Sequence, residues 1–367
     1  MSGKIVVAGA SGLVGRAVIE HFERLGDWDI VGLSRRKPVL VGKNTQYISV
    51  DLNNPADCAA KLAGLADVTH IVYTALFEKP ELAAGSIELD HMATNRAMFV
   101  NFLDVVEPAN RGSLRHVSLL QGAKAYGVHL GPAKIPGREL EPRHIHPNFY
   151  WLQEDHLKQA QHGKSWHWTI FRPQFIFGFA LGSPMNVLSA IGVYAWISKE
   201  LGLPLIFPGA GGPAVIELTD VRLLAKSIAW AGATATANGR TFNVTNGDVL
   251  VWEHVWPNVA RHFQMEVGVS HPMALSIVMP GKEPIWKEIQ RKYGLEPLPY
   301  EQIVGQAWQF ADMCFGFGAS APHSMLSTIQ IRKAGFPDCI DTTDMLNELF
   351  VELENRKIIP RPGSSAR

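Results

Sequence analysis

The chain lacks the features that mark secreted, membrane-spanning and nucleic-acid-binding proteins. Its 367 residues include three cysteines, Cys58, Cys314 and Cys339, which are too widely spaced for a disulfide framework or a zinc site and which we expect to be packing residues. Charged residues make up 19% of the chain, and 34 basic side chains balance 34 acidic ones, so no excess charge attracts nucleic acid. No apolar run is long enough to span a bilayer. We therefore expect a cytoplasmic protein with a small-molecule ligand and with neither a nucleic-acid nor a membrane partner.

Hydrophobic residues, by contrast, make up 47% of the chain, which is enough for a sizeable core. The length predicts one large domain with a substantial insertion, or two domains that share an interface. Three histidines, His129, His144 and His146, lie in or beside a stretch rich in proline, glycine and arginine. Their spacing matches no known metal site, so we interpret them as surface residues and predict no metal.

A glycine-rich turn follows the first apolar run. Residues 5–8 are β-rich, residues 9–15 read Gly-Ala-Ser-Gly-Leu-Val-Gly, and helical periodicity continues through Leu25. Glycines at these positions permit a tight turn and close approach of a pyrophosphate, which then lies at the N-terminus of the helix. The pattern favours dinucleotide binding over a purely structural turn.

The end of the second predicted strand, residues 28–33, indicates which dinucleotide binds. It continues into Ser34, Arg35 and Arg36, where an NAD-specific site usually has an acidic residue for the ribose hydroxyls. Two arginines and a serine suit the 2′-phosphate of NADPH instead, and the alternative is a solvated basic pair. Asp51, at the end of the third strand, is expected either to meet the adenine amino group or to cap the following helix.

Parallel strands place their carboxyl ends, and hence their ligands, at one edge of the sheet. Lys124 follows the fifth strand at this edge and is therefore a candidate site residue. The full set of predicted cofactor-binding residues is Gly9, Ser11, Gly12, Leu13, Val14, Gly15, Ser34, Arg35, Arg36, Asp51, Leu52, Thr74, Ala75, Ser118, Lys124, Tyr150, Pro173 and Ile176.

The alternation of strands and helices predicts an α/β fold with a doubly wound parallel sheet, the Rossmann fold. We assign residues 1–178 to this domain and expect residues 213–250 to rejoin it, beginning with a strand at 215–218. The pattern changes after Gly178 and is mainly helical past Trp252. Residues 179–212 and 251–367 are therefore predicted to form a smaller, mainly helical substrate-binding domain.

Tyr150 opens a predicted helix that begins after Pro147 and Asn148, with Leu152, Leu157 and Ala160 as its expected buried stripe. A tyrosine at this place in a nucleotide-binding protein is a candidate proton or hydrogen-bond donor. The alternative is a tyrosine that packs and hydrogen-bonds in the core.

Several segments together resemble the progesterone 5β-reductase and iridoid synthase family, an atypical branch of the extended short-chain dehydrogenases. They are Gly9 to Gly15, Arg35-Arg36, Gly122 to Tyr126, Asn148 to Asp155, Arg172-Pro173, Phe177 to Phe179, Ser183 to Asn186 and Phe242 to Asp248. The resemblance runs from the first strand to the carboxyl end. It implies an NADPH-dependent reductase of the C=C bond in α,β-unsaturated carbonyl compounds.

The resemblance also implies which lysine assists Tyr150. Ordinary short-chain dehydrogenases have a lysine four residues after the catalytic tyrosine, whereas this chain has Glu154 there. In the resembled family the lysine comes from an earlier loop, and the matching residue is Lys124. Two departures from the family, Trp151 in place of a second tyrosine and the absence of a tryptophan after the fourth strand, bear on which substrate is used.

In such a reduction the phenol of Tyr150 would stabilise the enolate oxygen, and a nearby Lys124 ammonium would stabilise phenolate character. Two other hypotheses stay open: a carbonyl reductase or sugar-nucleotide epimerase of the same class, and a non-catalytic NADPH-binding redox sensor. Oligomeric state is also open, and a homodimer is compatible with the sequence. The candidates for an apolar substrate pocket, each with core packing as its alternative, are Leu76, Phe149, Trp151, Phe177, Met185 and Phe315.

Overall fold

The computed structural model describes residues 2–36, 38, 44–79, 88–318 and 322–364. The chain divides into two compact units. Unit 1 contains residues 1–174, 221–244 and 326–338, and unit 2 contains residues 175–220, 245–325 and 339–367. The observed boundaries differ from the predicted ones, because residues 175–178, 213–220 and 245–250 belong to unit 2 and residues 326–338 return to unit 1.

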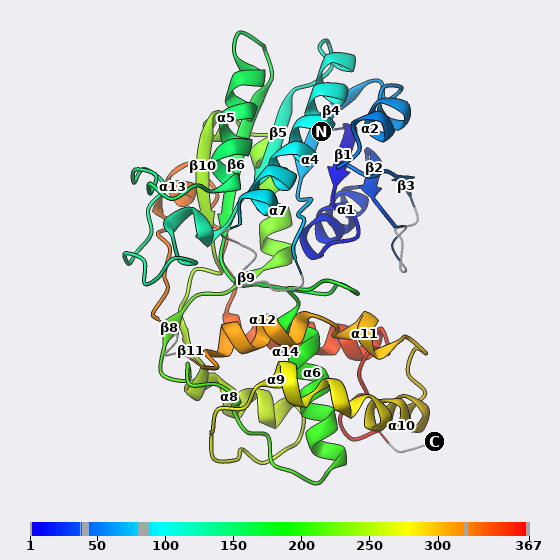
Figure 1. Ribbon diagram of the computed structural model, residues 1–367, viewed down its shortest axis with the longest axis vertical. Coiled ribbons are helices and arrows are strands. Elements are labelled where there is room, and N and C mark those ends of the chain that lie inside the picture. The colour runs from blue at the N-terminus through cyan, green and yellow to red at the C-terminus, as the bar shows by residue number, and fades with distance from the viewer. Residues whose placement is uncertain (1, 37, 39–43, 80–87, 319–321, 365–367) are drawn as a thin grey trace. The chain divides into compact units, whose positions relative to one another are not determined.

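Unit 1 is built on a seven-stranded sheet in the order β10-β6-β5-β4-β1-β2-β3, with every neighbouring pair parallel (Figure 1). This arrangement confirms the predicted doubly wound Rossmann fold. Its strands are β1 (Gly3–Ala8), β2 (Trp28–Ser34), β3 (Thr45–Ser49), β4 (Val68–Tyr73), β5 (His116–Leu120), β6 (His167–Pro173) and β10 (Arg240–Val244).

Helices cover both faces of this sheet. One layer contains α2, α4 and α5, and the other contains α1 and α7, which pack against each other. Short helical turns and α13 complete the unit. The bounds are α1 (Leu13–Leu25), α2 (Pro55–Leu62), α4 (Leu89–Ala109), η1 (Ala123–Tyr126), α5 (Phe149–Gln161), α7 (Val221–Gly232), η2 (Ala235–Ala237) and α13 (Ile329–Lys333).

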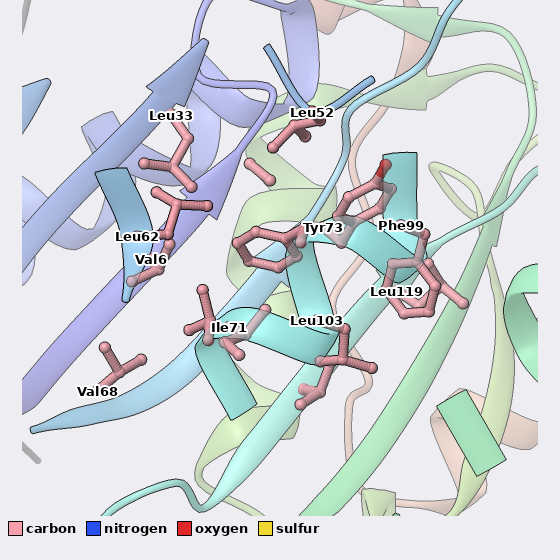
Figure 2. Close-up of a cluster of buried hydrophobic side chains, with 14 of the residues drawn as sticks. Val6, Leu33, Leu52, Leu62, Val68, Ile71, Tyr73, Phe99, Leu103 and Leu119 are labelled. Carbon is pink, nitrogen blue, oxygen red and sulfur yellow. The ribbon is translucent and has the colours of Figure 1, made fainter. Parts of the chain in front are cut away.

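The apolar core of unit 1 lies between the sheet and the layer of α2, α4 and α5. Figure 2 shows side chains from β1, β2, β4 and β5 meeting Phe99 and Leu103 of α4. Both of these side chains are completely buried, which stabilises the fold by about 1.5 to 3 kcal/mol for each. Because β4 is covered on both faces, all of its residues are buried and its sequence does not alternate. This core holds the carboxyl ends of β1, β4 and β5 in register.

Unit 2 is mainly helical, and α6 is its central element. Residues 187–198 of α6 are buried on every side, and α10, α12 and α14 pack against the helix (Figure 1). The elements are β7 (Ile176–Phe177), α6 (Val187–Glu200), β8 (Val215–Ile216), β9 (Thr219–Asp220), β11 (Leu250–Val251), α8 (Trp252–His262), α9 (Leu275–Val278), η3 (Pro280–Lys282), α10 (Glu283–Tyr293), α11 (Tyr300–Ile303), α12 (Ala307–Phe315) and α14 (Thr342–Asn355).

One strand prediction is wrong. Residues 215–218 do not rejoin the large sheet, because β8 pairs antiparallel with β11 inside unit 2. The chain rejoins unit 1 at α7 and β10. A two-residue strand pairs through too few hydrogen bonds for its sequence to specify which sheet it joins.

Candidate active site

The turn between β1 and α1 has the geometry that the glycine pattern predicts. Gly9 has a φ of +92°, in the region that glycine favours, and its amide donates a hydrogen bond of 3.0 Å to the Leu33 carbonyl of β2. A Cβ at Gly15 would lie 2.2 Å from the Gly9 carbonyl oxygen. Only glycine at position 15 therefore lets α1 begin this close to the turn.

The start of α1 suits an anionic ligand. Its N-cap, Gly12, has no side chain that could bond to the first amides, and the first turn contains no acidic residue. The first N–H groups of a helix have no partner within the helix and carry partial positive charge. A pyrophosphate fits this helix start, as in other dinucleotide-binding folds.

The serines that end β2 and β3 hydrogen-bond to the backbone carbonyls of Arg35 and Arg36. The hydroxyl of Ser34 donates to the Arg36 carbonyl at 2.7 Å, and the hydroxyl of Ser49 donates to the Arg35 carbonyl at 2.9 Å. Both arginine side chains are exposed, so their guanidinium groups can reach a phosphate in solution. Asp51 is also exposed.

One alternative for Asp51 is wrong, because it does not cap the next helix. Asn54 is the N-cap of α2, and its Oδ1 accepts from the amides of Ala56 and Asp57. Asp51 instead accepts from the Asn53 amide. Leu52 packs into the core (Figure 2), so only its backbone is placed to meet a ligand.

Asn148 fixes the backbone of Tyr150, and Gly122 leaves room for its hydroxyl group. Asn148 is the N-cap of α5: its Oδ1 accepts from the Tyr150 amide at 3.0 Å, and its Nδ2 donates to the Lys124 carbonyl at 2.9 Å. One side chain thus fastens the segment of Lys124 to the start of α5. A Cβ at Gly122 would lie 3.1 Å from the Tyr150 hydroxyl oxygen, so glycine leaves room for the phenol.

The face of α5 that is buried differs from the predicted stripe. Leu157 is buried, but Leu152 is exposed, and Gln153 and Glu154 are buried instead. Gln153 Nε2 donates to the Asn95 carbonyl of α4 at 2.9 Å. The helix therefore packs through polar contacts as well as through Leu157 and Ala160 of the predicted stripe, and hydrophobic periodicity alone could not show which polar residues turn inward.

Lys124 lies beside a carboxylate that the sequence did not single out. Its Nζ is 3.5 Å from Oε1 of Glu78, and Oε2 of Glu78 is 3.3 Å from Nε2 of His91 on α4. The side chains of Glu78 and His91 are buried. Glu78 follows the end of β4, and its position among apolar residues at the carboxyl edge of the sheet was the signal available for finding it.

The surroundings of Tyr150 keep its phenol protonated. Burial raises its pKa above the ordinary value of about 10, the Glu78 carboxylate raises it further, and the guanidinium of Arg172 acts in the opposite direction. Burial, the Glu78 carboxylate and the Arg172 guanidinium thus act on the pKa of the phenol. The assistance of Lys124 to the phenol stays a prediction.

Glu154 occupies the position where ordinary short-chain dehydrogenases have lysine, and three cations surround it. Its carboxylate oxygens lie 2.6 Å from Lys158, 3.0 Å from Arg143 and 3.5 Å from Arg172, and Gln121 Nε2 donates to it at 3.1 Å. Burial alone would raise the pKa of Glu154, but its hydrogen bond to Lys158, the charge of Lys158 and the bonds from Gln121 and Arg143 lower it.

The predicted substrate residues fall into two groups. Leu76, Phe149 and Trp151 gather with Tyr150 in one apolar cluster of unit 1. Phe177, Met185 and Phe315 belong to unit 2, where the Phe177 and Phe315 rings are buried against the indole of Trp252 with centroids 6.3 and 5.4 Å away. For these two phenylalanines the structure shows core packing.

The three histidines of the long loop lie close together. The ring centroid of His129 is 5.8 Å from that of His144 and 6.2 Å from that of His146, and all three side chains are partly buried. Burial lowers the pKa of His129 to about 4, helped by the positive charge of Lys124. These residues, which the sequence led us to interpret as surface groups, are therefore clustered and partly buried. Within the described ranges, no group of three His, Cys, Asp or Glu side chains is placed to hold a metal.

Comparison with known proteins identifies the family. The model of the PRISE-like Rossmann-fold domain matches residues 45–314. The chain belongs to this family. An (S)-8-oxocitronellyl enol synthase of Antirrhinum majus is 32% identical over 374 residues, with 97% of this chain and 92% of that protein covered. An enzyme of the same name from Catharanthus roseus is 33% identical, with 84% and 81% covered. The predicted resemblance to atypical extended short-chain dehydrogenases is thus confirmed.

Solved structures share the fold at low sequence identity. A short-chain dehydrogenase/reductase superfamily protein of Agrobacterium tumefaciens with bound NAD is 16% identical, with a TM-score of 0.63 over 97% of this chain and 98% of that one. The UDP-glucose 4-epimerase of Bifidobacterium longum, in complex with NAD⁺ and UDP, is 13% identical, with a TM-score of 0.66 over 97% and 99%. Family and fold together indicate an oxidoreductase with a nicotinamide cofactor. In the described part of the chain, no helix is both long and apolar enough to cross a membrane.

Proposed function

We propose that this protein reduces the C=C bond of α,β-unsaturated carbonyl compounds with NADPH. The observation that carries the proposal is the phenol of Tyr150, which burial keeps protonated at the N-terminus of α5, with Lys124 supplied by an earlier loop. NADPH, when bound, supplies the hydride that adds to the β-carbon of the substrate. Negative charge then develops on the carbonyl oxygen.

Tyr150 is suited to stabilise that oxygen. A neutral phenol is a hydrogen-bond donor, and a donor already fixed in place before the reaction stabilises charge without reorganising. Asn148 fixes the start of the helix and Gly122 leaves space at the hydroxyl. Conjugate reduction needs only that the phenol hold the enolate oxygen, since solvent can protonate the α-carbon.

The residues at the dinucleotide site fit NADPH. The uncapped start of α1 suits the pyrophosphate, and the exposed Arg35 and Arg36 suit a 2′-phosphate that only NADPH carries. Lys124 is suited to the nicotinamide ribose, because its ammonium lies 3.5 Å from Glu78 and Asn148 fastens its backbone to the start of α5.

The names of the plant relatives support the same chemistry. Both are called synthases of an enol. An enol is the protonated form of the enolate that remains when hydride has added to the β-carbon of a conjugated carbonyl compound. A phenol that donates to oxygen is the group such a reaction needs.

Labelled cofactor distinguishes this proposal from its alternatives. With NADPH deuterated at C4 and a simple cyclic enone, we expect deuterium at the β-carbon and an intact ketone. Deuterium at the carbinol carbon of an allylic alcohol would instead show a carbonyl reductase. Absence of transfer to a panel of cyclic and linear enones and carbonyl compounds, with NADPH binding retained, would favour a non-catalytic sensor.

A further inference from the structure

Unit 1 contains a pocket that none of the predicted cofactor-binding residues lines. It is a pocket of about 460 Å³ between the segment 139–144, α5, the edge strand β10 with its neighbour β6, and α13. We call it the edge pocket. Neither Tyr150 nor Lys124 lines it, and none of the glycines of the β1–α1 turn does. Its volume is in the range of pockets that hold small molecules.

Positive charge predominates in the edge pocket. Five cationic side chains line it, against the three carboxyl groups of Glu139, Glu141 and Glu154. The cationic residues are Lys134, Arg143, Lys158, Arg172 and Arg240.

The ion pairs of the pocket balance part of this charge. Lys134 pairs with Glu141 and Arg143 pairs with Asp155, each at 2.8 Å, whereas Glu154 is shared by Lys158, Arg143 and Arg172. Arg172 is 5% exposed, and it shares its carboxylate with two other cations, so a further anion nearby would be attracted to it.

Arg240 is hydrogen-bonded to neutral groups. Its guanidinium donates to Oε1 of Gln330 at 2.7 Å and to the Thr236 carbonyl at 3.5 Å. Glu139, the carboxyl group that interacts with it across the pocket, has its pKa raised by burial.

Cations lie over the aromatic rings of the pocket walls. The guanidinium groups of Arg143 and Arg172 lie 4.8 and 5.3 Å from the ring centroid of Trp151, and the ammonium of Lys158 lies 5.3 Å from that of Trp168. A cation held over a ring is already positioned before a ligand binds.

We propose that the edge pocket binds a small multivalent oxyanion, such as a phosphate ester or a polycarboxylate. Arginine and lysine donors from α5, β6 and β10 surround the anionic group, and the rings of Trp151 and Trp168 hold Arg143, Arg172 and Lys158 in position. Tyr150 does not line the pocket, although the neighbouring Trp151 does, and the proposal does not depend on the reaction that the protein catalyses.

Calorimetric titration tests the proposal on the full chain, with pyrophosphate and citrate as probes and NADP⁺ present to fill the dinucleotide site. We expect one saturable site for at least one probe, and the stronger probe distinguishes phosphate from carboxylate chemistry. Arg240→Gln and Lys158→Gln should each weaken binding about 10-fold or more, the effect of losing a hydrogen bond to a charged group.

Arg261→Gln is the matched control, because Arg261 is an exposed arginine of unit 2 that also bonds to a neutral side chain, that of Asn258. It should leave binding unchanged. The proposal is overturned if neither probe binds saturably, or if all three variants weaken binding alike, which would show a general effect of ionic charge. Thermal unfolding of each variant confirms that it is folded.

Discussion

The buried carboxylate of Glu78 joins Lys124 to His91, with one oxygen 3.5 Å from the lysine ammonium and the other 3.3 Å from the imidazole. This places the lysine of the proposed reaction between a loop and α4, outside the helix that carries Tyr150. The carboxylate raises the pKa of Tyr150 as well. One acidic side chain thus holds the cation and helps to keep the phenol neutral.

Removing Lys124 should abolish most turnover. Lys124→Met deprives the nicotinamide ribose of its proposed donor and leaves the Glu78 carboxylate buried without its ammonium, so both activity and stability should fall. The double variant Lys124→Met/Glu78→Gln should recover stability, because no unpaired charge remains, while turnover stays low. Recovery of turnover in the double variant would show that Lys124 only neutralises Glu78.

Loss of the Tyr150 hydroxyl should slow the reaction without ending it. Because the phenol is proposed to hold an enolate oxygen, Tyr150→Phe removes one oxyanion donor, which typically costs about 10²- to 10³-fold in turnover, or about 3 to 4 kcal/mol. Steady-state kinetics with the enone identified by deuterium transfer measures this. Unchanged turnover in Tyr150→Phe would remove Tyr150 from the chemistry.

Gly122→Ala tests the position of the same hydroxyl without touching it. The added methyl group would lie 3.1 Å from the phenol oxygen, so Tyr150 must shift by a few tenths of an ångström. We expect turnover to fall on the order of 10-fold, since small displacements of a catalytic group are costly, with little change in the melting temperature. Gly112→Ala is the control, because a Cβ there meets no atom within 4 Å.

Cofactor preference should depend on Arg35 and Arg36. The native protein should favour NADPH over NADH, and Arg35→Ala with Arg36→Ala should erode that preference by about 1.5 to 3 kcal/mol for each lost arginine–phosphate contact. The measurement is the ratio of kcat/KM for the two cofactors. Equal Michaelis constants for NADPH and NADH in the native protein would contradict the assignment.

Glu154 should matter for stability more than for turnover, and the effect should depend on pH. Its folded-state pKa lies below the ordinary value of 4.5, so its contribution to stability is complete above about pH 4.5 and is lost as the pH falls through the folded-state value. The difference in melting temperature between the native protein and Glu154→Gln should therefore shrink below pH 4.5. A difference that stays constant down to pH 3 would argue against an ionised Glu154 in the folded protein.

Local sequence patterns predicted the parts of the site whose backbone structure depends on residues adjacent in the chain. The turn of Gly9 to Gly15 and the helix that begins at Asn148 were identifiable because each is a short stretch with its own backbone requirements. The contact of Glu78 with Lys124 joins positions 46 residues apart, and no local pattern records such a pairing. The return of residues 326–338 to unit 1 was missed for the same reason, since a short helix such as α13 has no sequence feature that names its packing partner.

The three cations around Glu154 limit how a lysine could be placed on α5, as in ordinary short-chain dehydrogenases, in addition to or instead of Lys124. Restoring the ordinary Tyr-x-x-x-Lys spacing by Glu154→Lys would place an ammonium against Lys158, Arg143 and the buried Arg172, where like charges repel strongly. The ordinary arrangement is therefore not reachable from this one by a single substitution. A protein with this arrangement would first have to lose or neutralise at least one of the three cations around position 154. Successive single mutations therefore cannot easily move the lysine from the loop of Lys124 back to α5.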